Sequence, residues 1–239
     1  MAKNPGKTNL ISWWAFDEAS GNAVDSHGAN HLTETSGTIA SAAGKVGNAR
    51  DIEADDTEWF EIADNASLSL GADTAFSFFG WINVESVTAR RVVLSKNDSG
   101  GSFGGIEYWM EIGTSRRLYC IISNGATYTT VTTTNTISTG TFAFIHYYHD
   151  PISNVIGASI NAAAPKTAAW SGGTFNGANS FNIGRTSAGL YYDGLVDEFG
   201  FYKDRFLSTD EIDWLYNSGN GREYSNFASF SGSSQVIIF

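Results

Sequence analysis

The sequence predicts an all-β fold in which two antiparallel sheets pack as a sandwich, with one short helix near the C-terminus. Short segments rich in β-branched and aromatic residues recur along the 239-residue chain, separated by clusters of Gly, Asn, Asp and Ser. With 26 Gly and only 3 Pro, the turns depend mainly on Gly, Asn and Asp. The 16 Phe, 10 Tyr and 7 Trp supply a large core, which excludes a disordered chain.

Eleven segments have the composition of strands, and several of them alternate in side-chain character with a period of two. The segment 75–84 carries apolar residues on both faces, which predicts a central strand covered on both sides. The expected strands are 10–17, 59–64, 75–84, 91–96, 106–112, 117–123, 127–134, 141–150, 154–161, 180–185 and 195–203.

One segment, 208–219, has a helical pattern. Ser208 is a good N-cap, Glu211 follows at the capping-box spacing, and Gly219 is placed to end the helix. Because no repeat or low-complexity linker interrupts the chain, we expect one domain over 10–224, preceded by an arm (1–9) and followed by an extension (225–239). The extension ends in the apolar segment QVIIF, which could pair with the edge of another subunit.

The charge and cysteine content exclude several classes of function. The net charge is −11, so the surface repels phosphate backbones and anionic lipids, and we expect neither nucleic acid nor membrane as a partner. Cys120 is the only cysteine, which excludes an internal disulfide and a cysteine metal cluster. We expect Cys120 to be a buried apolar residue. No apolar run is long enough to span a bilayer, and the N-terminus lacks the pattern of a secretory signal.

Catalytic patterns are weak in this sequence. No GxSxG motif accompanies the four histidines, and His146 and His149 are expected as packed or turn residues. Glu107 and Glu111 flank Trp109 at alternating positions of one expected strand, where paired carboxylates of a glycosidase could lie. Trp109 cannot share a proton with either glutamate, so two solvated glutamates beside an aromatic ring are the favoured interpretation.

Two kinds of binding site are candidates. Trp59, Trp109 and Trp170 adjoin polar or Gly-rich residues, and an exposed Trp face can stack against a sugar ring, although partial burial at a rim is the more common fate. Calcium prefers oxygen ligands, which Asp25 and Asn30 of the loop 25–30 supply. A sandwich often brings its first and last strands together, so Asp197 is expected near Asp25, and the three residues form a candidate structural calcium site.

From Leu10 to Gly221 the chain resembles the laminin-G-like group of concanavalin A-like lectin/glucanase domains. The resemblance rests on the opening LISWWAFDEASGNAVDSHGANH, on FSFFGWI (76–82), on FIHYYHD (144–150) and above all on the closing stretch 182–221. Phe142 stands where the family usually has Trp, which we expect to alter packing only. The resemblance implies a concanavalin A-like jelly roll and a non-catalytic module that binds glycans or proteins, often with calcium. The acidic triplet of the family's glucanases is absent, because Trp109 holds its middle position.

We therefore expect a non-catalytic, surface-exposed structural or adhesive module. In the first hypothesis it is a subunit or decoration protein of a larger assembly such as a bacteriophage virion, joined to other subunits through its C-terminal strand, and it can form a homo-oligomer. In the alternative it is a free carbohydrate-binding lectin, and a glycoside hydrolase is the remote alternative. The expected location is a virion surface or the extracellular space.

Overall fold

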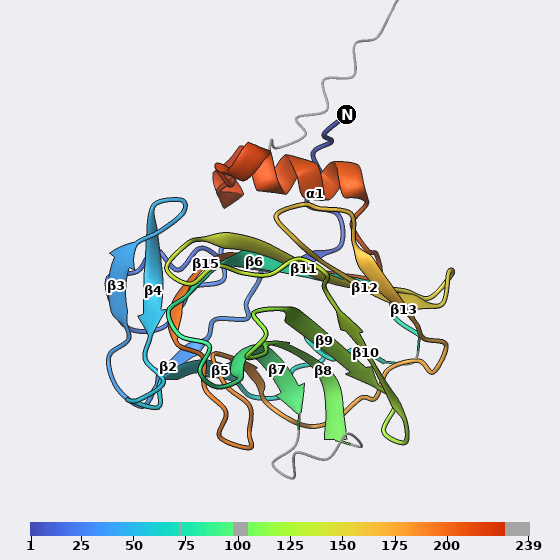
Figure 1. Ribbon diagram of the computed structural model, residues 1–239, viewed down its shortest axis with the longest axis horizontal. Helices are drawn as coiled ribbons and strands as arrows, with labels where there is room; N and C mark the ends of the chain where they lie inside the picture. Colours follow the sequence, from blue (N-terminus) through green and yellow to red (C-terminus); the bar gives the residue numbers. More distant parts are fainter. Residues whose placement is uncertain (72, 98–104, 228–239) are drawn as a thin grey trace, which may run out of the picture.

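The computed structural model describes residues 1–71, 73–97 and 105–227, and it shows two antiparallel sheets packed face to face with one helix lying across the outer side (Figure 1). This confirms the predicted jelly-roll sandwich with a short C-terminal helix. Every one of the eleven expected strands is present, although several are shorter by a few residues than the sequence suggested.

One sheet has eight strands in the order β13-β12-β11-β6-β15-β4-β3, with β1 pairing the second half of β15. Its strands are β1 (Leu10–Trp14), β3 (Ala40–Ala43), β4 (Asn48–Ile52), β6 (Phe76–Val84), β11 (Ala143–Asp150), β12 (Val155–Ile160), β13 (Lys166–Ala169) and β15 (Gly194–Lys203). The other sheet has seven strands in the order β10-β9-β8-β7-β14-β5-β2. These are β2 (Thr33–Thr35), β5 (Trp59–Ile62), β7 (Arg91–Asn97), β8 (Ile106–Ile112), β9 (Leu118–Ser123), β10 (Tyr128–Thr132) and β14 (Phe181–Ile183).

The sequence analysis missed the short strands β2, β3, β4 and β13. β4 lies between β15 and β3 and is partly buried, but its residues NARDI mix polar and charged side chains with apolar ones. β2, β3 and β13 lie at the edges of their sheets, and none of these three contains a buried residue. Because edge strands bury little apolar surface, the alternation that marks a strand is absent from these segments.

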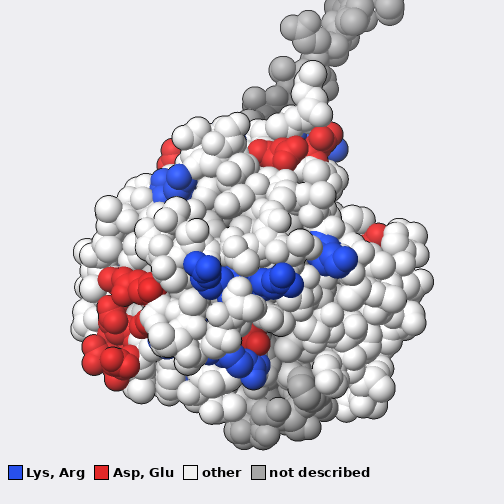
Figure 2. All heavy atoms as spheres, viewed as in Figure 1, with Lys and Arg blue, Asp and Glu red and all other residues white. Residues whose placement is uncertain are grey.

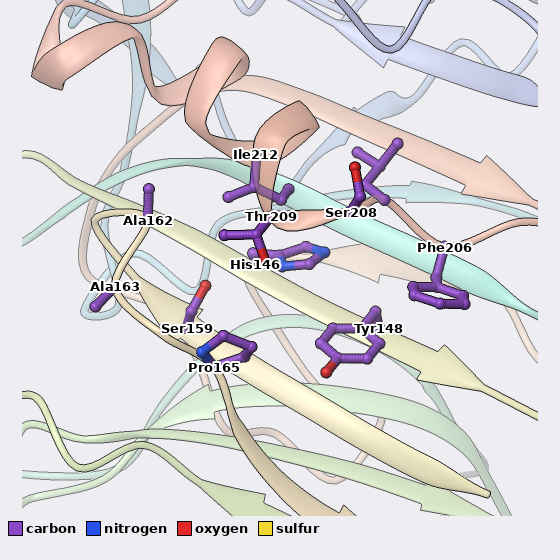
Figure 3. A pocket seen from close by; sticks show the side chains of 11 residues that line it. His146, Tyr148, Ser159, Ala162, Ala163, Pro165, Phe206, Ser208, Thr209 and Ile212 are labelled. Atoms are coloured by element: carbon purple, nitrogen blue, oxygen red, sulfur yellow. The ribbon is translucent and has the colours of Figure 1, made fainter. Parts of the chain in front are cut away.

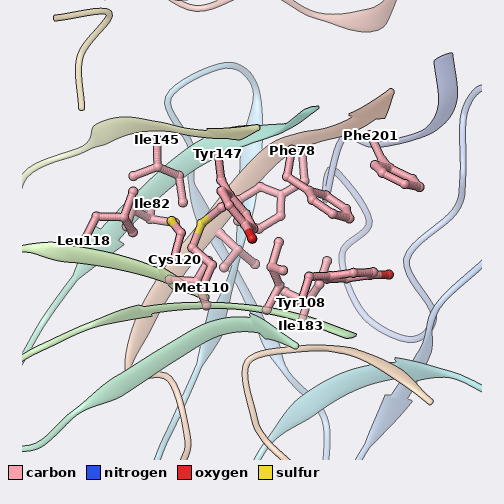
Figure 4. Close-up of a cluster of buried hydrophobic side chains, with 14 of the residues drawn as sticks. Phe78, Ile82, Tyr108, Met110, Leu118, Cys120, Ile145, Tyr147, Ile183 and Phe201 are labelled. Atoms are coloured by element: carbon pink, nitrogen blue, oxygen red, sulfur yellow. The ribbon is translucent and has the colours of Figure 1, made fainter. Parts of the chain in front are cut away.

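The main core fills the space between the two sheets. Aromatic and aliphatic side chains from both layers interdigitate there, among them Phe78, Tyr108, Met110, Tyr147 and Phe201 (Figure 4). The rings of Phe78 and Phe201 stack at a centroid distance of 4.2 Å. Cys120 is buried in this core, as expected.

β6 is the central strand that the sequence predicts, paired with β11 on one side and β15 on the other. Two glycines let it pack closely against β15: the ring of Phe199 lies over Gly80, and the ring of Phe79 lies over Gly200. A Cβ on Gly80 would lie 2.0 Å from Phe199 Cδ1, and a Cβ on Gly200 would lie 2.1 Å from Phe79 Cζ. Each glycine therefore makes room for a phenylalanine of the neighbouring strand.

The outer face of the eight-stranded sheet carries a second core under the helix α1 (Thr209–Tyr216). Ile212 and Leu215 of α1 pack against Trp81 and Phe144 of the sheet. The Glu211 carboxylate accepts the Ser208 backbone N–H at 3.0 Å, which is the expected N-terminal cap interaction. Within the described part of the chain, no helix has the length and hydropathy that a membrane crossing requires.

The helix ends earlier than the sequence suggested. Asn217 adopts the left-handed conformation with φ of 50° and stops the α-helix two residues before Gly219, which instead ends a short 3-10 turn (Asn217–Gly219). Asparagine can fill this position because its short polar side chain tolerates positive φ.

Both ends of the described chain lie against the helix side of the molecule. Lys3 N donates to Asp210 O at 2.9 Å, and the Tyr202 hydroxyl donates to Gly6 O at 2.5 Å, so the N-terminal arm is held by its own domain (Figure 1). Phe227 is buried against Trp13, with ring centroids 5.1 Å apart. The segment QVIIF and the rest of 228–239 lie outside the described residues.

Candidate functional site

Trp59 is the most accessible of the three candidate tryptophans. It is half-buried, whereas Trp109 and Trp170 are only 5% and 7% exposed. Because Phe60 points into the core, its strand neighbours Trp59 and Glu61 point outward from the seven-stranded sheet. The Arg185 guanidinium lies 3.9 Å from the centre of the Trp59 ring, and Trp59 Nε1 donates to Glu61 Oε2 at 3.2 Å.

Tyr191 completes this group, with its ring centroid 6.1 Å from that of Trp59. Arg185 and Tyr191 face each other through an isolated β-bridge that brackets the loop 186–190. We call Trp59, Glu61, Arg185 and Tyr191 the Trp59 platform. It combines two aromatic rings, a cation and a carboxylate on one partly exposed surface.

Buried polar atoms without partners adjoin the platform. Asn182 lies between Glu61 and Ser95 in the cross-strand register, and its Oδ1 has no hydrogen-bond partner. Arg185 Nε and Trp109 Nε1 are also buried without a partner. Such atoms are uncommon in native proteins, and a bound ligand or water is one way to satisfy them.

Trp109 itself is covered and offers no stacking surface. It packs with Val92, Ile106 and Ile121 on the outer face of the seven-stranded sheet, and Leu190 from the loop 186–190 packs against this cluster. Trp170 is buried in the main core between the two sheets, and its Nε1 donates to Gly173 O at 2.8 Å. The structure therefore does not bring the three tryptophans together.

The two candidate carboxylates of the remote hydrolase hypothesis are each held in a separate ion pair. Glu107 is fully buried and accepts a hydrogen bond from Lys96 Nζ at 2.7 Å. Glu111 is 5% exposed and pairs with Arg90 at 2.6 Å. The expectation of two solvated glutamates is wrong, because long cationic side chains reach each of them. The expectation that His146 and His149 are packed is confirmed by exposures of 3% and 0%.

Asp25 organises its own loop. Its Oδ1 accepts the backbone N–H groups of Trp13, His27 and Gly28, and its Oδ2 accepts that of Asn30, all within 3.0 Å. Both oxygens of this carboxylate therefore already accept backbone amides. The described residues show no hydrogen bond that links Asp25 or Asn30 to Asp197.

Asp197 and Glu198 form a different carboxylate pair at a bulge in β15. The register against β6 shifts between Asp197 and Gly200, and Glu198 has φ of 50°. A bulge re-aims side chains that would otherwise point to opposite faces of the sheet. Asp197 Oδ2 accepts the amides of Lys45 and Val46 at 2.6 and 2.9 Å, and Glu198 accepts Trp13 Nε1.

Each carboxylate of this pair keeps one buried oxygen without a partner, Asp197 Oδ1 and Glu198 Oε1. Burial raises the pKa of Asp197 to about 7, although the two amides oppose the shift. Burial and the neighbouring Asp197 raise the pKa of Glu198 to about 9. Two neighbouring buried carboxylates repel each other, so binding of a proton or a cation at this pair is favourable.

A calcium ion would fit these free oxygens in part. Calcium takes six to eight oxygen ligands, including backbone carbonyls and water, so two carboxylates would be a minority of its ligands. Within 1–71, 73–97 and 105–227, the structure contains no group of three or more His, Cys, Asp or Glu side chains placed to hold a metal. Sequence analysis did not identify Glu198 as a candidate ligand. The pattern that marks it is Asp-Glu followed by Phe-Gly inside an apolar strand, which is typical of a bulge.

Acidic side chains dominate one edge of the molecule. Figure 2 shows them gathered over the β2–β4 side. Burial raises the pKa of Asp51, Glu53, Glu58 and Glu85, and carboxylates such as Asp193 add to the shift in Asp51, Glu53 and Glu85. This mutual repulsion makes the edge unsuitable for an anionic partner.

Comparison with known proteins agrees with the fold. The family described as the concanavalin A-like lectin/glucanases superfamily matches residues 55–213, about two thirds of the chain. The comparison with curated proteins finds no match. Among solved structures, domain 4 of AbnA, a GH43 extracellular arabinanase from Geobacillus stearothermophilus in complex with arabinotriose, is similar with a TM-score of 0.65 and 20% identity, over 90% of this chain and 98% of that one.

Two toxin binding domains are also similar. The binding domain of Paraclostridial Mosquitocidal Protein 1 has a TM-score of 0.71 and 14% identity, over 89% of this chain and 53% of that one. The binding domain of botulinum neurotoxin serotype G has a TM-score of 0.67 and 13% identity, over 87% and 50%. The chain thus spans about half the length of these toxin domains. With the family match covering most of the sandwich, the chain belongs to the concanavalin A-like lectin/glucanase superfamily.

Proposed function

We propose that this protein is a non-catalytic carbohydrate-binding module that holds its glycan on the Trp59 platform. The observation that carries the proposal is the half-buried Trp59 ring beside Arg185 and Glu61 on the outer face of the seven-stranded sheet. An aromatic face stacks against the apolar side of a sugar ring. Arg185, which lies over one face of Trp59, and Glu61, which accepts from its Nε1, would exchange hydrogen bonds with the sugar hydroxyls.

The unpartnered atoms support this location. A sugar hydroxyl can both donate and accept, so it suits an acceptor such as Asn182 Oδ1 and a donor such as Arg185 Nε. The similarity to an arabinanase domain that was solved with arabinotriose is consistent with a neutral arabino-oligosaccharide ligand. A related solved structure concerns a botulinum neurotoxin whose cell entry depends on two ganglioside molecules, so sialylated glycans belong in the same screen.

The test is a glycan screen that includes arabino-oligosaccharides and sialylated glycans, followed by titration calorimetry with the best binder. Trp59→Ala should weaken binding about fivefold to a hundredfold, by analogy with the stacking of nucleic-acid bases on aromatic side chains, which is worth about 1–3 kcal/mol. Tyr128→Ala is the matched control: Tyr128 is 45% exposed on β10, five strands or about 24 Å away in the same sheet. Failure of every glycan to bind, or equal weakening by both variants, would refute the proposal.

We also propose that calcium, if it binds, does so at the Asp197–Glu198 pair rather than at Asp25. Each of the two carboxylates offers an unpartnered oxygen, while both Asp25 oxygens already accept backbone amides. Calcium should raise the melting temperature of the EDTA-treated protein, and Glu198→Gln should abolish the increase. Asp25→Asn is the comparison variant. If only Asp25→Asn loses the calcium effect, the calcium site lies in the loop 25–30 instead.

Membership of a larger assembly such as a virion, with exposure there or outside the cell, is a second and separate proposal. It rests on the apolar QVIIF segment. The test is the solution mass of the full chain and of a version ending at Phe227, measured by light scattering. The cut follows Phe227 because that residue is part of the core beside Trp13. An oligomer that becomes a monomer on truncation supports assembly, and a monomer in both cases speaks against it.

A further inference from the structure

A cavity of about 280 Å³ lies on the outer face of the eight-stranded sheet, beside the start of α1. Figure 3 shows it between β11 and β12 below and the helix above. The Trp59 platform is on the other sheet, so the cavity belongs to a different surface of the molecule. Its lining includes His146, Tyr148, Ser159, Pro165, Phe206 and Ile212.

A row of nearly parallel aromatic rings forms one wall. His146 and Tyr148 are two residues apart on β11 and share a face of the sheet, and their rings are 5.2 Å apart at 19°. The Phe206 ring continues the row, 5.5 Å from Tyr148 at 21°. In Figure 3 Ile212 descends from the helix and Pro165 lies on the opposite side of the space. Such walls suit a flat apolar ring.

A hydrogen-bond chain reaches the buried His146 ring. Leu207 N donates to Ser77 Oγ at 2.9 Å, and Ser77 Oγ lies 3.2 Å from His146 Nε2. Because Ser77 Oγ already accepts the Leu207 amide, we assign its hydroxyl hydrogen to Nε2, which places the hydrogen of the neutral ring on Nδ1. Burial lowers the pKa of His146 to about 3, so the ring is neutral. Nδ1 makes no hydrogen bond with the described part of the chain, which leaves one N–H donor at the cavity.

The lining is free of formal charge. None of the eleven residues is Lys, Arg, Asp or Glu, and the polar groups besides His146 and Tyr148 are the hydroxyls of Ser159, Ser208 and Thr209. A charged ligand would lose its hydration here without gaining a counter-ion, which is costly. The size is at the low end for small-molecule sites, so the cavity holds one ring with a short substituent.

We propose that this cavity binds an uncharged small molecule that contains one aromatic ring and a hydrogen-bond acceptor. The ring lies against Tyr148 and Phe206, and the acceptor receives the Nδ1 hydrogen of His146. The glycan platform plays no part in this site, so either proposal can fail without the other.

The test uses acetophenone as the probe, titrated into the isotope-labelled full chain and followed by amide chemical shifts in NMR spectra. Shifts should concentrate at residues 146, 148 and 206–209. Toluene, which lacks the acceptor, should bind several-fold more weakly, and benzoate should bind at least tenfold more weakly because of its charge. Trp59→Ala should leave these affinities unchanged.

Two variants locate the contacts. His146→Gln keeps an acceptor for Ser77 but removes the Nδ1 donor, so it should weaken acetophenone about fivefold to tenfold and leave toluene unaffected. Ala163→Phe adds a ring at the lining turn and should abolish binding of both probes while the melting temperature stays near that of the wild type. Absence of localised shifts with acetophenone at millimolar concentration, or equal affinity for acetophenone and benzoate, would overturn the inference.

Discussion

The buried ion pair of Lys96 and Glu107 gives the sharpest test of how the sandwich is held together. Both side chains have no exposed surface. Lys96 Nζ donates to Glu107 Oε2 at 2.7 Å and to Gly177 O at 2.5 Å, and it contacts Asp64 Oδ1 at 2.9 Å. Lys96→Met keeps the length of the side chain but removes the cation, so Glu107 loses its counter-ion while it stays buried.

The expected cost of Lys96→Met at pH 7.5 is about 3–5 kcal/mol of unfolding free energy, the usual range when one partner of a buried pair is removed. Glu107→Gln should cost less, about 2 kcal/mol, because Asp64 still balances Lys96 and is itself partly exposed. The double variant contains neither buried charge. Its cost should therefore be smaller than the sum of the two single costs by about 2 kcal/mol or more.

The cost of Lys96→Met should also depend on pH. Burial already raises the pKa of Glu107, and Lys96 opposes that shift. Removing Lys96 raises the folded-state pKa further above the unfolded value near 4.5. A carboxyl group with a raised folded-state pKa destabilises the fold as pH rises above the unfolded value, and protonation relieves the penalty. The cost should thus be smaller at pH 5 than at pH 7.5.

The measurement is urea unfolding followed by tryptophan fluorescence, with the four proteins of the cycle compared at both pH values. A cost below about 1 kcal/mol for Lys96→Met, or strict additivity in the double variant, would show that the pair does not act as described. The same experiment tests whether Glu107 is structural. If it is, Glu107→Gln should lower the unfolding free energy to the same extent with and without a polysaccharide.

Three further predictions concern the packing around the sites. Gly80→Ala should lower the unfolding free energy by about 2–4 kcal/mol in urea unfolding, since its Cβ would lie 2.0 Å from Phe199 Cδ1, and adding Phe199→Leu should recover part of that loss. An unchanged urea midpoint would contradict the close packing. Asp25→Ala should make the loop 25–30 sensitive to limited proteolysis, because four amides lose their acceptor, and a protease pattern like that of the wild type would count against this role. Phe227→Ala should lower the unfolding free energy by about 3–5 kcal/mol and shift tryptophan emission to longer wavelength, because the Phe227 ring packs against Trp13. A variant as stable as the wild type would mean that the ring adds little to the second core.

The fold could be predicted well because the strands with buried faces show their alternation directly. The central strand β6 is apolar on both faces and occupies the position that this pattern predicts. The edge strands β2, β3 and β13 were missed because they bury nothing, and β4 was missed because polar and charged residues interrupt its pattern. The helix end was misplaced because Asn217 already adopts the left-handed conformation two residues before Gly219.

The candidate sites depended on contacts that sequence patterns do not carry. Trp109 is covered by Leu190, which lies 81 positions later in the chain, so its exposure could not be read from its neighbours. Asp25 accepts backbone amides of its own loop, an engagement that the sequence pattern alone does not reveal. Arg185 approaches Trp59 only because β14 pairs with β5, a pairing of segments more than a hundred residues apart.

The arrangement of the two ends of the described chain has a practical consequence. The N-terminal arm and Phe227 both lie on the helix side, while the Trp59 platform is on the outer face of the opposite sheet. A label, a solid support or a second domain attached at the N-terminus would therefore sit behind the sandwich and leave the platform facing outward. An immobilised protein would present the proposed glycan surface to solution, and the cavity beside α1 would be the surface that the attachment approaches.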